Sequence, residues 1–137
     1  WVAISLSTKI LSSADQCLFQ LAHEVGHLLY PTANRRTSTV PSTITFNEGV
    51  STHFSLIALK KFRGEEAYRQ AYESLRLHSP NYFAALNLVT RLLELNPRAV
   101  QKLRAVRPML NDAVEDDFNA AGVDADPELC AALVAVF

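Results

Sequence analysis

Apolar positions repeat at helical spacing over most of this 137-residue chain. The clearest case is residues 12–30, where leucine, alanine and valine fall on one stripe at about 100° per residue. Ser12 or Ser13 is suited to cap this helix, and Pro31 is suited to end it. The pattern predicts a long amphipathic helix that packs with one side and can line a cleft with the other.

Further elements are predicted on both sides of this helix. Val2, Ile4 and Leu6 alternate with small or polar residues, which favours a strand over residues 1–8. Serine or asparagine followed by proline, at 79–80 and 96–97, signals two helix starts. The fold class predicted is therefore mainly α, with one N-terminal strand and a C-terminal helical bundle. The further helices are expected near residues 47–62, 65–77, 80–96, 97–107, 109–121 and 127–136.

Composition narrows the class of protein. The chain is 49% hydrophobic and 20% charged, which is typical of a globular domain. A net charge of −1 gives no sign of bulk nucleic-acid binding, and no apolar run approaches the length of a membrane span. The first residues lack the basic start of a signal peptide, and Cys17 and Cys130 are expected to be buried free thiols. The compartment stays open, with the cytoplasm slightly favoured.

The long helix carries a His-Glu-x-x-His motif, formed by His23, Glu24 and His27. Two histidines four residues apart point about 40° from each other on a helix, so both imidazoles can reach one point. Glu24 projects roughly 60° from His27, close to that point without being a ligand. In zinc hydrolases, two neutral imidazoles hold Zn²⁺ and such a carboxylate takes the proton from water. Gly26 would let another backbone come close to this helix.

A catalytic zinc ion needs a third protein ligand, and Glu48 is the candidate. Twenty residues (28 to 47) separate it from His27, enough for a loop and the return of a second helix. A carboxylate on an apolar helix is costly to bury unless it is paired or binds metal, although the helix dipole alone would also favour it there. His53 points about 140° away from Glu48 and is expected to be no ligand. Thr52, about 40° away, could support a ligand through its hydroxyl.

The His-Glu-Val-Gly-His run at 23–27, followed by Asn-Glu-Gly at 47–49, resembles the gluzincin metallopeptidases, which include thermolysin and the alanyl-aminopeptidase-like enzymes. The resemblance covers about residues 1–95. It implies an α+β zincin-like domain with the strand at the edge of the cleft, zinc held by the two histidines and Glu48, and Glu24 as general base on a zinc-bound water. Thermolysin-like chains usually have Asp four residues after the Glu ligand, and here that residue is Thr52.

The same resemblance points to Tyr82 as a second catalytic residue. It lies on the first turn of a predicted helix, in a run that is similar to an aminopeptidase pattern. In that family the tyrosine hydroxyl donates a hydrogen bond to the tetrahedral intermediate. His78 is the next candidate for this donor, and an ordinary position at a helix start would explain Tyr82 equally well.

The predicted function is therefore a zinc-dependent peptidase that hydrolyses peptide bonds in a peptide or protein substrate. Two alternatives remain open: a non-catalytic zinc-binding interaction module, favoured by Thr52 and the small size, and a regulatory protease with one dedicated protein partner. We expect one domain over residues 1–137, trimmed or forming the C-terminal part of a longer chain, because a lone strand needs a partner and the chain starts without Met. Nothing in the sequence specifies an oligomeric state.

Overall fold

The computed structural model describes residues 4, 6, 13–29 and 42–137. Their regular structure is helical, apart from one isolated antiparallel bridge between Ile44 and Val136, so the described chain is mainly α as predicted. None of the described helices is long and apolar enough to cross a membrane. In chain order the helices are α1 (Ala14–Leu29), α2 (Thr45–Arg63), α3 (Glu65–His78), α4 (Pro80–Leu95), α5 (Ala99–Val106), the 3-10 helix η2 (Leu110–Asp112), α6 (Glu115–Ala120) and α7 (Pro127–Val134).

Two details of the prediction differ from the structure. No N-terminal strand is found among the described residues: Ile4 and Leu6 lie in no strand, and the rest of residues 1–8 falls outside the described part. The single helix expected over residues 109–121 is wrong, because η2 and α6 divide that segment. The Asp117 carboxylate accepts a hydrogen bond from the Val114 N–H at 3.0 Å. A side chain that binds the backbone in this way starts a new helix instead of continuing the old one.

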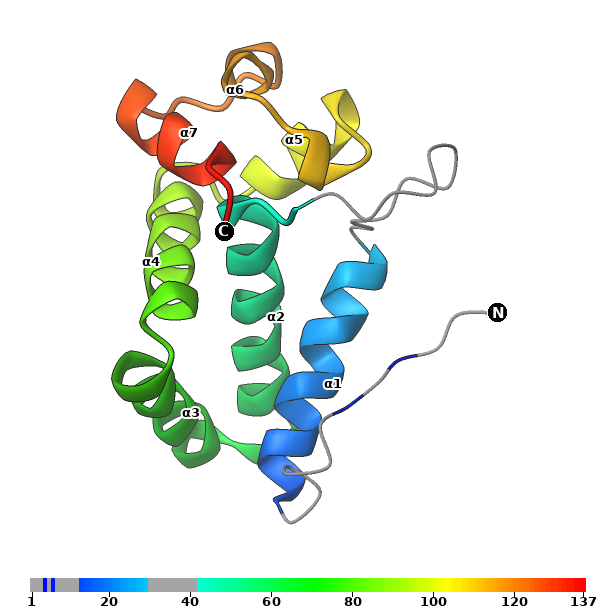
Figure 1. Ribbon diagram of the computed structural model, residues 1–137, viewed down its shortest axis with the longest axis vertical. Coiled ribbons are helices and arrows are strands. Elements are labelled where there is room, and N and C mark those ends of the chain that lie inside the picture. The colour runs from blue at the N-terminus through cyan, green and yellow to red at the C-terminus, as the bar shows by residue number, and fades with distance from the viewer. Residues whose placement is uncertain (1–3, 5, 7–12, 30–41) are drawn as a thin grey trace.

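Helix α2 lies at the centre of the molecule, between α1 and α4 (Figure 1). Two glycines allow this close packing. A Cβ atom on Gly49 would lie 2.5 Å from the carbonyl oxygen of Ala85 in α4. A Cβ atom on Gly26 in α1 would lie 3.1 Å from the Cα atom of Ser51 in α2. The prediction that Gly26 permits a close backbone approach is thus confirmed.

The C-terminal helices gather at the N-terminal end of α2 and form the main hydrophobic core with it (Figure 1). Phe46 at the start of α2 and Phe118 of α6 are both buried, and their ring centroids are 6.0 Å apart. A smaller apolar cluster at the other end joins Leu56 of α2 to Leu75 of α3 and Leu86 of α4. Burial of these side chains is the main force that fixes α2 in place.

Hydrogen bonds from the end of the chain fix the start of α2 more closely. The Thr45 N–H donates to the carbonyl of Ala135 at 2.9 Å, and the Phe137 N–H donates to the carbonyl of Thr43 at 2.9 Å. The Ile44 N–H donates to the side-chain oxygen of Asn111 at 3.0 Å. These bonds position the first turn of α2, which carries Glu48.

Candidate metal centre

The two motif histidines on α1 and Glu48 on α2 meet at one point. His23 Nε2 lies 3.1 Å from Glu48 Oε2 and 3.1 Å from His27 Nε2, and His27 Nε2 lies 3.5 Å from Glu48 Oε1. Tetrahedral ligands at about 2.0–2.2 Å from zinc lie roughly 3.3–3.6 Å from one another. The three groups can therefore hold one small metal ion, and their donor set of two imidazoles and a carboxylate suits zinc.

The site results from the close contact of two helices. The four-residue spacing brings His23 and His27 to the same side of α1, with their ring centroids 4.7 Å apart. Between them in sequence, Gly26 lies against Ser51 of α2, which brings the backbones near enough for Glu48 to reach both rings. The small residues Gly26 and Ser51 at the contact thus allow the longer histidine and glutamate side chains to converge beside it.

Burial and charge in this group favour a cation. The side chains of His23, His27 and Glu48 are 12%, 18% and 9% exposed. Burial alone would raise the pKa of Glu48, but hydrogen bonds and positive charge from the two histidines outweigh it and lower the pKa to about 2. Burial alone would lower the pKa of His27, but the hydrogen bond and charge of Glu48, with the charge of Glu24, raise it. The electrostatic potential at the point where the candidate ligand atoms meet is therefore negative, which stabilises a positive charge there.

The hydrogen bond that supports His27 comes from a residue that the sequence analysis did not select. Ser51 Oγ lies 3.2 Å from His27 Nδ1, on the ring edge opposite the ligand group. A proton on Nδ1 that is donated to Ser51 leaves the Nε2 lone pair free to face the point where the three candidate ligand atoms meet. The supporting role expected for Thr52 is wrong, since its side chain is fully buried and its hydroxyl has no hydrogen-bond partner among the described residues. Ser51 is three residues after Glu48, the one signal that could have identified it.

A cleft of about 620 Å³ opens beside the ligand group. Glu24 lines this cleft and is not part of the group of His23, His27 and Glu48. Its negative charge contributes to raising the pKa of both His27 and Tyr82, which line the same cleft. The structure therefore brings a second carboxylate next to the three candidate ligands.

Tyr82 also lines this cleft, and its ring lies 5.8 Å from the ring of His23 in an edge-on arrangement. Phe137 packs against Tyr82 with ring centroids 4.8 Å apart. Burial, with the charges of Glu48 and Glu24, raises the pKa of the Tyr82 hydroxyl. That hydroxyl keeps its proton at neutral pH and can act as a hydrogen-bond donor.

Other candidates from the sequence lie elsewhere. His78 is exposed at the end of α3 and does not line the cleft. His53 is half-buried, burial lowers its pKa, and it does not belong to the ligand group, as expected. Cys17 and Cys130 are free thiols, as predicted, but only Cys130 is fully buried.

Comparisons of the chain with protein-family models, with curated proteins and with solved structures find no match. What characterises the site is therefore its own geometry. It consists of a largely buried His-His-Glu group, a serine that supports one histidine, and a glutamate and a tyrosine on the adjoining cleft.

Proposed function

We propose that this protein is a zinc-dependent peptidase of gluzincin type, in which α1 is the motif helix and α2 the third-ligand helix of a zincin-like domain. The observation that carries the proposal is the convergence of His23, His27 and Glu48 beside Glu24 in an open cleft. Two histidines and one glutamate, with a position left open, are the ligand set of catalytic zinc in peptidases.

The two histidines would hold the ion through Nε2, and Glu48 would hold it through a carboxylate oxygen. Zinc bound there would polarise the carbonyl of the scissile peptide bond and help to stabilise the negative charge that develops on its oxygen. Ser51 would keep His27 in the tautomer that this ligation needs, because it accepts the Nδ1 proton.

Glu24 would act as the general base. Its carboxylate lies on the cleft beside the ligands, so it can accept a proton from the attacking water and pass it to the leaving amine. Tyr82 is the proposed donor to the oxyanion, since its hydroxyl keeps its proton and its ring lies against His23. Neither Glu24 nor Tyr82 belongs to the proposed ligand group, so replacing either residue should lower turnover without removing zinc.

The test compares zinc content and peptide turnover in the same preparations. Glu24→Gln should retain zinc and lose about 10²–10⁴-fold in kcat, the usual contribution of a general base. Tyr82→Phe should retain zinc and lose about 10²–10³-fold in kcat. His78→Gln is the matched control, an exposed residue off the cleft, and should turn over as the wild type does.

Four results would count against the proposal as stated. Unchanged turnover in Glu24→Gln would show that Glu24 is not the general base. Zinc that stays bound after Glu48→Ala would show that Glu48 is not a ligand. Zinc binding by a wild-type protein that cleaves no peptide would instead indicate the non-catalytic zinc module, and cleavage of a single protein target alone would indicate the regulatory protease.

A further inference from the structure

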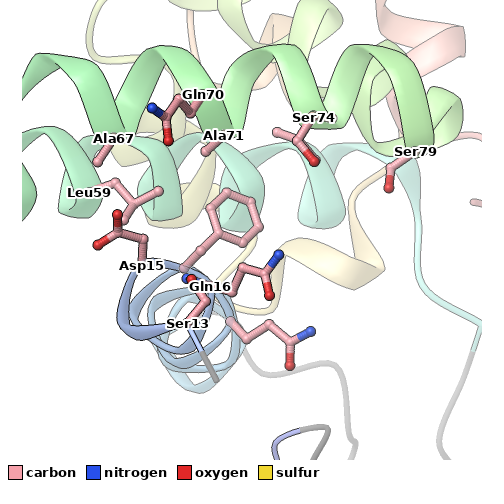
Figure 2. Close-up of a pocket in the computed structure, with 12 residues that line it drawn as sticks. Ser13, Asp15, Gln16, Leu59, Ala67, Gln70, Ala71, Ser74 and Ser79 are labelled. Atoms are coloured by element: carbon pink, nitrogen blue, oxygen red, sulfur yellow. The ribbon is translucent and has the colours of Figure 1, made fainter. Parts of the chain in front are cut away.

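A second cavity continues from the metal cleft along α1. It has a volume of about 500 Å³ and lies where α1 faces α3, with Leu59 of α2 contributing to its wall. Phe19, Gln20, Leu75 and Ser79 line both this cavity and the cleft beside the ligand group, so the two are continuous; we call the second cavity the α1–α3 groove. Figure 2 shows the side chains of α1 and α3 directed toward each other across it.

The lining of this α1–α3 groove is neutral. Amide and hydroxyl side chains such as Gln16, Gln70 and Ser74 alternate with apolar ones such as Phe19 and Ala71. Of the described residues on its wall, only Asp15 is ionisable, and its carboxylate pairs with Arg63. Among the described residues no lysine or arginine lines the groove, so this part of the wall does not suit a phosphate or another anion.

Neutral donors and acceptors over an apolar floor suit the backbone of a polypeptide and its uncharged side chains. The groove also has the length for several residues. Asp15 and His23 lie eight positions apart on α1, a rise of about 12 Å, which an extended chain spans with about four residues.

We infer that the α1–α3 groove binds about four residues of an extended, uncharged polypeptide segment on one side of the cleaved bond. This inference rests on the proposed peptidase function. It makes the substrate a polypeptide cut at least about four residues from one of its ends, not a dipeptide or tripeptide.

The first experiment varies substrate length. Mixtures of peptides of four, six, eight and ten residues, built from neutral amino acids, are incubated with the zinc-loaded protein, and mass spectrometry locates the cleaved bonds. Cleavage should require about four residues on one constant side of the bond, and kcat/KM should level off once that side is filled. Equal cleavage of all lengths at all bonds would overturn the inference.

The second experiment fills the groove. Ser74→Trp places a large ring in it from an exposed position on α3, and Ala71→Phe does so from a half-buried one. Each should lower kcat/KM for the ten-residue peptides at least about tenfold, as the loss of a substrate pocket does, with zinc content unchanged. Leu77→Trp is the matched control, because Leu77 is 61% exposed on α3 and does not line the groove.

Binding without cleavage separates this inference from the proposed function. A fluorescent ten-residue neutral peptide is titrated into Glu24→Gln, alone and combined with Ser74→Trp. If no peptide is cleaved by the wild type but Ser74→Trp still weakens this binding at least about tenfold, the peptidase proposal fails and the groove stands. If the wild type cleaves peptides but Ser74→Trp and Ala71→Phe change neither cleavage nor binding, the groove assignment is wrong and the peptidase stands.

Discussion

The two sides of α2 are both buried but are built from different side chains. The side that faces α1 carries the polar residues Glu48, Ser51 and Ser55, and each of them has a hydrogen-bond partner. Glu48 bonds to His23, Ser51 bonds to His27, and the Ser55 hydroxyl donates to the Ser51 carbonyl at 2.9 Å. The side that faces the C-terminal helices carries Phe46 and Val50 in a continuous apolar core. Buried polar groups add little net stability, whereas buried apolar surface adds much. The apolar side thus holds α2 in place and leaves the polar side available for chemistry.

The largest expected effect comes from the apolar side. Phe118→Ala removes a ring that is 1% exposed and packs near Phe46, and should lower the free energy of unfolding by about 3–5 kcal/mol. Denaturant unfolding of the metal-free protein measures this loss. Phe62→Ala is the matched control, since Phe62 is 67% exposed, and its effect should stay within about 0.5 kcal/mol. Similar losses in both variants would break the comparison.

The two glycines of α1 and α2 test the two sides directly. In Gly49→Ala the new methyl group meets backbone oxygen of Ala85 in α4, which cannot rotate away, and stability should fall by about 1–3 kcal/mol. In Gly26→Ala the new methyl group meets Ser51 Oγ at 3.0 Å and Ser51 Cα at 3.1 Å, and would displace the residue that contacts His27 Nδ1. Gly26→Ala should therefore lower zinc affinity more than stability, and Gly49→Ala the reverse. Unfolding curves and zinc titrations of both variants show which order holds.

Ser51→Ala sharpens the comparison within the polar side. Loss of the hydroxyl beside His27 Nδ1 should weaken zinc binding by about 10–100-fold, with little change in the unfolding of the metal-free protein. The control is Thr52→Val, which removes a buried hydroxyl that has no partner among the described residues. Competition with a zinc chelator measures both affinities. If Thr52→Val weakens zinc binding and Ser51→Ala does not, the two roles are reversed.

The smallest effect depends on pH and lies in the C-terminal region. A hydrogen bond from Arg107 outweighs burial and lowers the pKa of Asp117 below its ordinary value of 3.8. A lowered folded-state pKa stabilises the fold above the unfolded pKa, and this stabilisation is lost as the pH falls through the folded value. Arg107→Gln should therefore be less stable than the wild type by a constant amount above about pH 5, and the difference should shrink below about pH 4. The free energy of unfolding of both proteins is measured as a function of pH. A difference between them that stays constant down to the lowest pH would contradict this prediction.

Local patterns predicted most of the fold and the ligand group. Helical spacing located the helices, and the four-residue spacing of His23 and His27 is a property of one helix, so it needs no knowledge of the fold. Ser51 and Thr52 lie three and four residues after Glu48, so helical spacing allows either one, and the choice between them depends on how α2 is rotated against α1. The break between η2 and α6 depends in part on Asp117 binding Arg107, ten positions earlier, and so escaped the periodicity of that segment.

The bridge between Ile44 and Val136 also bears on the order of folding. The three candidate ligands lie within positions 23–48, whereas this bridge joins residues 92 positions apart (44 to 136). Contacts that close long loops cost more chain entropy and form slowly. We therefore expect the pairing of α1 with α2 to begin early, and the first turn of α2 to reach its final position only when α7 docks. Placement of Glu48, the third candidate ligand, would then depend on a contact that forms late.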